Sequence, residues 1–451
     1  MNPHSISVGK TLKMAIATAA ILLLTAQAFA ASHIRVLGLV KHGDEVTPPP
    51  TDAECRSSLY PSPCYSPQEM RNAYGLDSLI DAGFVGKGET IVIIDSYGSP
   101  TITADLKTFD KAYGLPDPPS FKVLSPLGTV PFDPNDSTQT GWAFEATLDV
   151  EWAHAIAPGA SIVLLTSPVA ETEGVQGLPQ FLALEKYALD HHLGKIISQS
   201  WGATENTLFD TAGRQVVKEF EDFYKYASTK QVTVLASSGD SGSSNTELDG
   251  VTYYTFPTVG YPASSPWVTA VGGTSLYAST SGQYSYELVW NEQGGAGGGG
   301  TSQIFQEPDY QVALLPSSVN PLLNGMRGLP DVSYNADPYT GILVYLSFLG
   351  SDNAGYYEIG GTSEGSPQWA GIVADLNQYA RQPLGFLNRV LYSVGSRGLL
   401  PKYGRDITLG GNGLNNVPGY YAGPGWDLTT GWGTPDFRNV MKQKFDLLAP
   451  N

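Results

Sequence analysis

The sequence predicts an α/β fold with a mostly parallel central sheet and helices on both faces. Apolar runs of strand length alternate with helical stretches; the runs span 90–96, 161–167, 195–200 and 232–238, and the helices lie near 180–193 and 214–229. Continuous apolar runs are typical of parallel strands that are buried on both sides. The chain has 451 residues, of which 15% are charged, so it can form one large domain with a sizeable core.

The first 30 residues have the features of a secretory signal peptide. Two lysines precede an apolar stretch at 14–24, and the Ala-Phe-Ala sequence at 28–30 forms a cleavage signature. We therefore predict a signal peptide at 1–30, a mature chain that begins at Ala31, and a secreted protein, with the periplasm as the alternative location. An uncleaved membrane anchor is the other interpretation, but the apolar stretch is short for a bilayer span.

Residues 31–64 form a Pro-rich segment that contains both cysteines of the chain, Cys55 and Cys64. Two cysteines in an exported protein favour one disulfide, and they do not suggest a metal site. The formal net charge of −18 and the pI near 4.6 argue against nucleic acid or an anionic membrane surface as a partner.

A helix is predicted for residues 141–160, which are rich in Ala, Leu, Glu and Trp. Glu145 and Asp149 are four positions apart, so they share one face of this helix. His154 follows Glu145 by nine positions, which turns it about 180° away from that acidic pair. Such a pair is by itself more typical of a solvated helix face than of a catalytic site.

Two further aspartates lie where predicted strands end. Asp95 follows the apolar run that starts at Thr90, and Asp240 lies in the Gly/Ser turn after the run at 232–238. Catalytic groups favour such strand ends, although aspartate is also a common turn residue because its side chain accepts backbone hydrogen bonds.

Ser363 lies between an extended run and a predicted helix in the segment 356–380. Gly360 and Gly361 permit a sharp turn and a close backbone approach, and the Ser-Pro pair at 366–367 predicts a helix N-cap followed by the first helical residue. The residues around Ser363 also fit the G-x-S-x-G pattern of a nucleophile elbow. This geometry suits a nucleophilic serine.

A serine nucleophile needs a base, and all six histidines precede Ser363 in the chain. This order excludes the Ser, Asp/Glu, His sequence of an α/β-hydrolase triad, and it argues against an esterase of that type. A subtilisin-type order of Asp, His and Ser stays open, with Asp95 as its first member.

Together these motifs resemble the sedolisins, which are serine-carboxyl peptidases with a subtilisin-like fold. Glu145 and Asp149 match the family's Glu-x-x-x-Asp helix, Asp240 matches its Ser-Gly-Asp-Ser-Gly turn, and Ser363 matches its Gly-Thr-Ser-x-x-x-Pro motif. Further similar segments lie at 261–275, 327–341 and 425–435, and the resemblance covers nearly all of residues 65–451. It implies a three-layer subtilisin-like domain over 65–451.

The resemblance also implies roles for the matched residues. Ser363 would attack the scissile carbonyl, Glu145 would take its proton, Asp149 would orient Glu145, and Asp240 would stabilise the oxyanion. Only a protonated carboxyl donates a hydrogen bond to an oxyanion, so these roles imply an acidic working pH. Asp95 is then interpreted as a structural residue at a strand end.

Near the C-terminus, the segments 404–413 and 422–433 place two aspartates among glycines, a mixture of hard oxygen ligands that suits calcium. The resemblance implies one structural calcium ion, whose ligands would be the carboxylates of Asp406 and Asp427 and the main-chain oxygens of Ile407, Gly423 and Gly425.

Two features have two interpretations each. The run GGAGGGG at 294–300 is either mobile or closely packed backbone, and in sedolisins a Gly-rich segment here lies beside the substrate cleft. Trp201 is either a buried aromatic that supports the sheet or a residue near that cleft. His191 and His192 end a predicted helix, where they would interact with its last carbonyls.

The expected function is that of a secreted, monomeric endopeptidase that cleaves proteins or peptides at acidic pH. A tripeptide-releasing exopeptidase and a catalytically inactive binding module are the alternatives. Sedolisins are usually made with a large N-terminal prodomain, for which residues 31–64 are too few. We therefore expect folding without such a prodomain or with the help of a separate protein.

Overall fold

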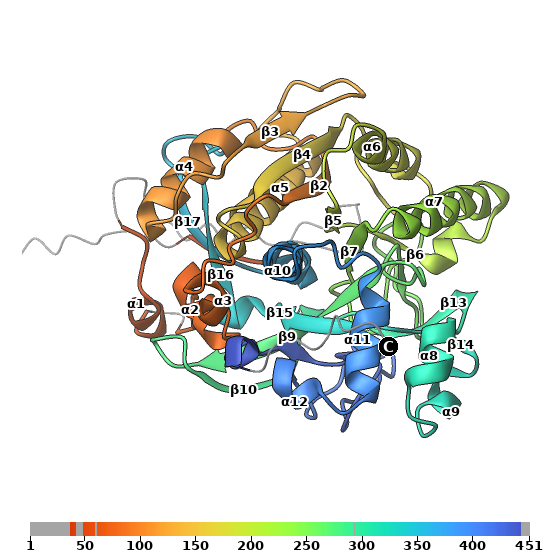
Figure 1. Cartoon of the computed structure of the whole chain (residues 1–451). Helices are drawn as coiled ribbons and strands as arrows, with labels where there is room; N and C mark the ends of the chain where they lie inside the picture. Colours follow the sequence, from red (N-terminus) through yellow and green to blue (C-terminus); the bar gives the residue numbers. More distant parts are fainter. Residues whose placement is uncertain (1–36, 42–47, 59–60, 293, 443–451) are drawn as a thin grey trace, which may run out of the picture.

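The computed structural model describes residues 37–41, 48–58, 61–292 and 294–442, and it confirms the predicted α/β fold (Figure 1). The signal peptide predicted at 1–30 lies outside the described residues. The central sheet has eight strands in the order β10-β9-β7-β5-β2-β4-β3, with β15 also paired to β9. β10 runs antiparallel to β9, and the other pairings of the sheet are parallel. The strands are β2 (Thr90–Ser96), β3 (Phe121–Leu124), β4 (Ser161–Ser167), β5 (Ile196–Gln199), β7 (Thr233–Ser237), β9 (Thr269–Ala278), β10 (Tyr284–Val289) and β15 (Val332–Asn335).

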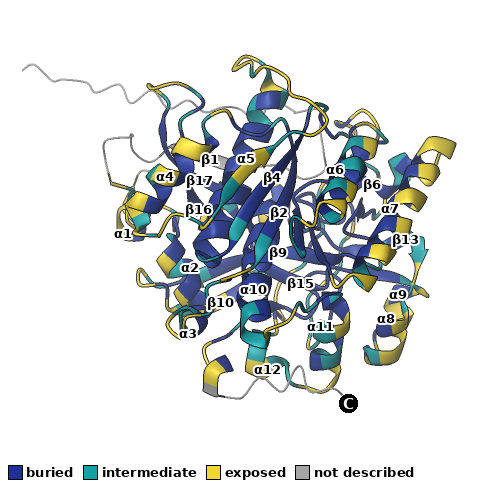
Figure 2. Ribbon diagram, turned by 45° about the horizontal axis from the view of Figure 1, so that its top comes forward, coloured by how far each residue is buried: buried dark blue, intermediate teal, exposed yellow. Residues whose placement is uncertain are grey.

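Helices cover both faces of this sheet, as predicted. Along β2, Ile91 and Ile93 belong to one hydrophobic cluster with residues of α5 (Ser137–Ile156) and α10 (Gly365–Ala380). Residues of α4 (Ile102–Tyr113) belong to the same cluster. The alternate residues Val92 and Ile94 pack with α6 (Leu178–Asp190) and α7 (Thr211–Thr229). The central strands are accordingly dark blue in Figure 2, whereas the outer side of α7 is yellow. This alternation explains why the strands read as continuous apolar runs.

Two predicted helix starts differ from the structure. The acidic helix α5 begins at Ser137, because the carboxylate of Asp136 caps it by accepting the amides of Thr138 and Gln139 at 2.9 and 3.3 Å. It ends at Ile156, so residues 157–160 are not helical. The N-cap predicted at Ser366 is wrong. A 3₁₀ turn, η3 (Thr362–Glu364), runs directly into α10, and the Ser366 hydroxyl pairs with that of Ser198 at 3.0 Å.

A second, smaller sheet directly precedes Ser363 in the chain. It consists of β1 (Leu37–Lys41), β17 (Gly355–Gly360) and β16 (Ile342–Leu346), all antiparallel and in that order. The extended run predicted before Ser363 is β17. It therefore lies outside the central sheet, and its last residue, Gly360, is three positions from Ser363.

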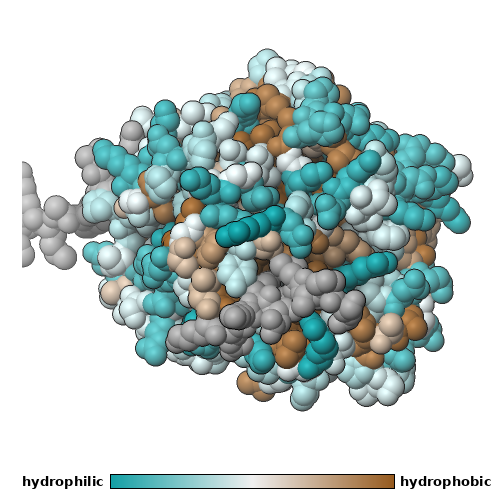
Figure 3. All heavy atoms as spheres, in the orientation of Figure 1, coloured by the Kyte–Doolittle hydropathy of each residue, from teal (hydrophilic) through white to brown (hydrophobic). Residues whose placement is uncertain are grey.

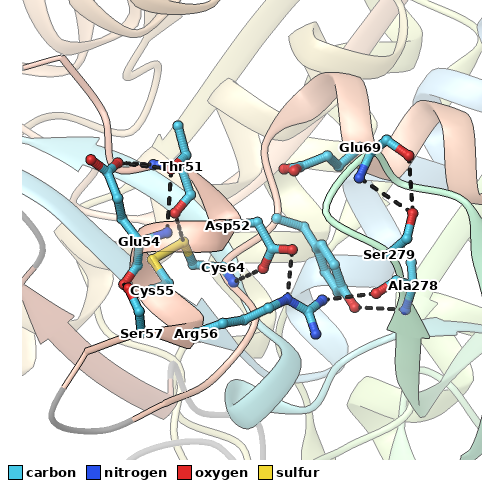
Figure 4. A network of polar contacts seen from close by, with 12 residues as sticks. Thr51, Asp52, Glu54, Cys55, Arg56, Ser57, Cys64, Glu69, Ala278 and Ser279 are labelled. Carbon is cyan, nitrogen blue, oxygen red and sulfur yellow. Dashed lines mark hydrogen bonds and ion pairs between the residues drawn. A yellow bond between two sulfur atoms is a disulfide. The ribbon is translucent and has the colours of Figure 1, made fainter.

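The N-terminal segment contains the helix α1 (Asp52–Arg56) and a disulfide, and it packs against the central sheet (Figure 4). Cys55 and Cys64 form the predicted disulfide. The Arg56 guanidinium lies 2.7 Å from the Asp52 carboxylate and donates to the carbonyl of Ala278 at 2.8 Å. These contacts dock the segment onto the far end of β9.

Shorter elements complete the described part of the chain. The helices are α2 (Pro67–Ala73), α3 (Asp77–Ile80), α8 (Asp309–Leu314), α9 (Asn320–Leu323), α11 (Leu387–Ser396) and α12 (Leu400–Tyr403), with 3₁₀ turns η1 (Glu205–Leu208), η2 (Pro338–Thr340) and η4 (Val440–Lys442). The short strands are β6 (Ala203–Thr204), β8 (Gly260–Tyr261), β11 (Asn291–Glu292), β12 (Gly295–Ala296), β13 (Gly300–Gln306), β14 (Met326–Leu329), β18 (Gly404–Arg405) and β19 (Thr434–Pro435).

The surface shown in Figure 3 is predominantly hydrophilic, with smaller hydrophobic areas between the polar side chains. Within the described residues, we find no helix whose length and hydropathy would let it cross a membrane.

Candidate active site

Ser363 follows a turn that requires glycine at positions 360 and 361. Gly361 has φ +116°, a conformation that L-residues with side chains rarely adopt. A Cβ on Gly360 would lie 2.4 Å from the Pro338 nitrogen, so the backbone approaches too closely for any side chain. The turn thus places Ser363 in η3, directly before α10, and buries it completely. This agrees with the predicted sharp turn and close approach.

Helix α5 brings Glu145 and Asp149 to the same site. Both are buried, and the Ser200 hydroxyl, just beyond β5, donates to Asp149 Oδ1 at 2.9 Å. The hydroxyls of Ser363 and Ser200 also favour the ionised form of Glu145 and so oppose the rise of its pKa. The acidic pair therefore faces the serine and is not the solvated helix face that spacing alone suggested.

Burial dominates the electrostatics of this pair. It raises the pKa of Glu145 well above its usual value, and the charge of Asp95 adds to the rise. The pKa of Asp149 is raised in the same way, first by burial and then by the charges of Asp95 and Glu145. Because these carboxyls lie close together, their protons leave in coupled steps, and at acidic pH the pair can share a proton.

The turn that carries Asp240 is fastened to the residue before the nucleophile. Asp240 Oδ1 accepts the Thr362 amide at 2.7 Å and the Thr362 hydroxyl at 2.8 Å. The Gly239 amide donates to the same hydroxyl at 3.1 Å, and the Ser237 hydroxyl donates to the Thr362 carbonyl at 3.0 Å. The charge of Asp240 also raises the pKa of Glu145. The structure thus brings all the predicted catalytic residues together.

Asp95, predicted to be a structural residue at a strand end, lies with this group as well, because its charge acts on both Glu145 and Asp149. It is fully buried, and its carboxylate oxygens have no hydrogen-bond partner among the described residues. Burial raises the pKa of Asp95 to about 8. The signal that could have revealed it is the alternation along β2, because Asp95 follows Ile91 and Ile93 on the face that α5 covers.

His154 lies on the other side of α5, as predicted. Its Nε2 is 2.8 Å from the Pro116 carbonyl and 3.3 Å from Asp110 Oδ1, and burial lowers its pKa to about 4. His191 Nδ1 lies 3.0 Å from the Tyr187 carbonyl at the end of α6, which confirms the predicted helix-end contact. The part of the chain that the structure describes therefore offers Ser363 no imidazole partner. The bases near Ser363 are carboxylates.

Trp201 is fully buried against aromatic rings of the two outer helices. Its ring centroid lies 4.5 Å from that of Phe181 in α6 and 6.0 Å from that of Phe220 in α7. The structure therefore favours the interpretation in which Trp201 supports the sheet.

The glycine-rich run 294–300 is closely packed along 297–299, not mobile. A Cβ on Gly298 would lie 2.2 Å from the Ser238 carbonyl oxygen, and one on Gly299 would lie 2.2 Å from that of Leu428. The loop thus lies against the turn that carries Asp240, and only glycine permits this contact.

Four of the five residues predicted to bind calcium are paired by hydrogen bonds, and the fifth, Ile407, directly follows Asp406 in the sequence. Asp406 Oδ2 accepts the Gly425 amide at 2.8 Å, and Asp427 Oδ2 accepts the Gly423 amide at 3.0 Å. Burial raises the pKa of both aspartates, and these amide bonds oppose the rise. No cluster of three or more His, Cys, Asp or Glu side chains occurs within the described ranges, so a metal here would need main-chain oxygens. Two carboxylates with carbonyls form an all-oxygen donor set that fits calcium.

Comparison with known proteins shows the family to which this chain belongs. The model of the subtilase family, Peptidase_S8, matches residues 133–388, a range that contains Glu145, Asp149, Asp240 and Ser363. The chain is 36% identical to kumamolisin from Bacillus sp. over 85% of its length and 64% of kumamolisin. It is 32% identical to sedolisin from Pseudomonas sp., over 83% of the chain and 60% of sedolisin. The chain belongs to the sedolisin group of the subtilase family.

Other sedolisin relatives agree with this membership. Human tripeptidyl-peptidase 1 is 32% identical over 66% of the chain and 51% of its own length. The solved structure of Pseudomonas sedolisin, a serine-carboxyl proteinase complexed with pseudo-iodotyrostatin, matches with a TM-score of 0.66 and 29% identity over 84% of the chain and 98% of that structure. The chain spans between about half and two thirds of the length of the curated relatives named here.

Proposed function

We propose that the protein is a secreted, monomeric serine-carboxyl endopeptidase that hydrolyses peptide bonds at acidic pH. The observation that carries this proposal is the meeting of Ser363, Glu145, Asp149 and Asp240 in one buried site, without a histidine among the described residues around them. The disulfide between Cys55 and Cys64 supports export, because disulfides persist in oxidising compartments.

In the proposed reaction, Ser363 Oγ attacks the carbonyl carbon of the scissile bond and gives its proton to Glu145. The carboxyl of Asp149, which is held by Ser200, stabilises the protonated Glu145 through the shared proton. Glu145 then passes the proton to the leaving amine, and an acyl-enzyme forms on Ser363. A water molecule hydrolyses this ester by the same steps in reverse.

Asp240 supplies the oxyanion contact in this scheme. Its Oδ1 accepts both hydrogen bonds from Thr362, so a proton on Oδ2 would be the one that is donated to the oxyanion. This donation requires the neutral acid, and the reaction therefore stops when Asp240 ionises.

The experiment that tests this function is digestion of a denatured protein at acidic pH, followed by sequencing of the product termini. Cuts at internal positions from the earliest time points are the expected result. Sequential release of tripeptides from the N-terminus would instead assign the activity that the name of tripeptidyl-peptidase 1 describes. A folded chain that cuts neither way would support the binding-module alternative.

We also propose that Asp406, Asp427 and the carbonyls of Ile407, Gly423 and Gly425 hold one calcium ion. When bound, the ion would neutralise the two carboxylates and tie the segments 404–407 and 423–427 together. The role of the ion would be structural, because its ligands do not include Ser363 or the carboxyl groups of Glu145, Asp149 and Asp240.

Removing calcium should lower the melting temperature by roughly 5 °C, since a ligand that binds only the folded state adds to its stability. Asp406→Asn should abolish this calcium-dependent shift. Asp436→Asn is the matched control, because Asp436 pairs with Arg438 and Arg405 instead. A melting temperature that does not respond to calcium in the unmodified protein would contradict the site.

A further inference from the structure

Asn412 lies in the segment 404–413, which is predicted to contribute to a calcium site, yet its side chain contacts the glycine-rich loop. The side chain is fully buried. Its Nδ2 donates to the carbonyls of Gly297 and Gly299, each at 3.2 Å, and its Oδ1 accepts the Tyr420 amide at 2.9 Å. A buried amide with both donor hydrogens and its acceptor in use has one well-defined position.

The loop that Asn412 holds is in turn bonded to the turn that carries Asp240. The Gly298 amide donates to the Gly239 carbonyl at 2.8 Å, and the Ala296 amide donates to the Asp240 carbonyl at 3.0 Å. The Ser238 hydroxyl donates to the Gly298 carbonyl at 2.7 Å. The peptide group between Gly297 and Gly298 therefore joins the two, because its carbonyl accepts from Asn412 and its amide donates to Gly239.

The main chain of Asn412 contacts the other end of the same turn. Its carbonyl accepts the Ser243 amide at 3.0 Å. A Cβ on Gly242 would lie 2.1 Å from this carbonyl oxygen, so the contact also explains why the turn has glycine there. Asn412 thus holds the Asp240 turn from two sides, through the loop at 297–299 and directly at Ser243.

We infer that Asn412 is a positioning residue that fixes Asp240 for its role at the oxyanion; this inference rests on the proposed function. Without the Asn412 amide, the buried carbonyls of Gly297 and Gly299 lose their donors, and the loop must shift to find others. Such a shift would move the main chain that carries Asp240. An oxyanion donor acts mainly in the transition state, so its displacement lowers kcat more than it changes KM.

Asn388 in α11 provides a matched control. It too is fully buried, and it also makes three side-chain hydrogen bonds: Nδ2 donates to the Val268 carbonyl at 2.9 Å and the Tyr310 hydroxyl at 3.1 Å, and Oδ1 accepts from Thr269 at 2.7 Å. These partners include neither the glycine-rich loop nor the Asp240 turn. Alanine at 388 or 412 removes the same number of bonds, so the two variants separate a loss of stability from a loss of positioning.

The test compares the unmodified chain with Asn412→Ala, Asn412→Asp and Asn388→Ala, at acidic pH and per folded molecule. Asn412→Ala should lower kcat by about 10- to 100-fold with KM changed by less than about twofold, because a small misplacement is costly in a transition state. Asn388→Ala should leave kcat near that of the unmodified chain. Asn412→Asp should fall between them, since a protonated carboxyl keeps one donor and the acceptor for Tyr420. This variant also keeps the test decisive if the alanine variant does not fold.

Hydrogen exchange provides a readout that does not depend on activity. Peptides that cover 238–243 and 295–300 should exchange faster in the Asn412 variants than in the unmodified chain. In Asn388→Ala, the exchange rates of these peptides should not change. Equal kcat losses at 388 and 412, or unchanged exchange in both peptides, would overturn the inference. An unmodified chain that cleaves no peptide would refute the proposed function, and the exchange comparison would still decide whether Asn412 holds the turn.

Discussion

Replacing Ser363 with alanine is expected to lower kcat/KM on a peptide substrate by about 10⁵-fold, because no other group forms the acyl-enzyme. The melting temperature should change little, since the substitution removes one hydroxyl, and its partner Glu145 also interacts with the hydroxyl of Ser200. Initial rates with a fluorogenic peptide, together with thermal melts, measure both effects.

Ser366→Ala is the matched control for this prediction. Ser366 lies three residues later and is equally buried, but its hydroxyl pairs with Ser198. It should retain most of the activity. If Ser363→Ala kept more than about a hundredth of the activity, a nucleophile other than Ser363 would be required.

Glu145→Gln is expected to lower kcat by about 10³- to 10⁴-fold, because the amide has nearly the same shape but cannot accept the serine proton. The loss should not be rescued at any pH between 3 and 8, since glutamine does not titrate in this range. Single-turnover kinetics would place the loss in the acylation step.

Glu151→Gln on the same helix separates the role of Glu145 from that of any buried acid. Glu151 is fully buried, and it accepts the Tyr345 amide at 2.9 Å away from the serine. Burial raises the pKa of Glu151 well above its usual value, as it does for Glu145. If both glutamine variants lost activity equally, the effect would be one of stability, and Glu145 would not be the base.

The strands could be predicted well from the sequence because burial on both faces leaves a simple pattern. The runs that begin at Thr90 and Ser161 have the bounds of β2 and β4. Helix starts were harder. Ser366 followed by proline has the composition of an N-cap, but its hydroxyl forms a hydrogen bond with that of Ser198. The helix is instead preceded by the 3₁₀ turn η3.

The site could be predicted only in part. Glu145 and Asp149 lie on one face of a helix whatever its exact ends, so their spacing was informative. From the sequence, Asp95 is either the first member of a subtilisin-type triad or a structural residue, and Asn412 does not stand out, because the importance of both depends on which segments pack against them. The contact between Asn412 and the loop at 297–299 joins parts of the chain more than 100 residues apart, as its hydrogen bonds show. No local pattern encodes such a contact.

The buried carboxyls also make stability depend on pH. Burial raises the pKa of Asp95 and Glu221 to about 8 and that of Glu173 to about 7. A carboxyl whose pKa is higher in the folded than in the unfolded state contributes stability that is complete below its unfolded pKa, near 4. That contribution is lost as the pH rises through 7 to 8. Any loss of activity near neutral pH must therefore be separated from unfolding.

The pH dependence of kcat/KM, with the folded fraction measured by circular dichroism in the same buffers, tests the central claim most directly. If Glu145 is the base and a neutral Asp240 the oxyanion donor, activity per folded molecule should rise as the Glu145–Asp149 pair loses its first proton and should fall again as Asp240 ionises, so that it is lost by neutral pH. Activity that instead rises to a plateau at neutral pH would show that no neutral carboxyl is needed as the oxyanion donor. That result would contradict the serine-carboxyl mechanism.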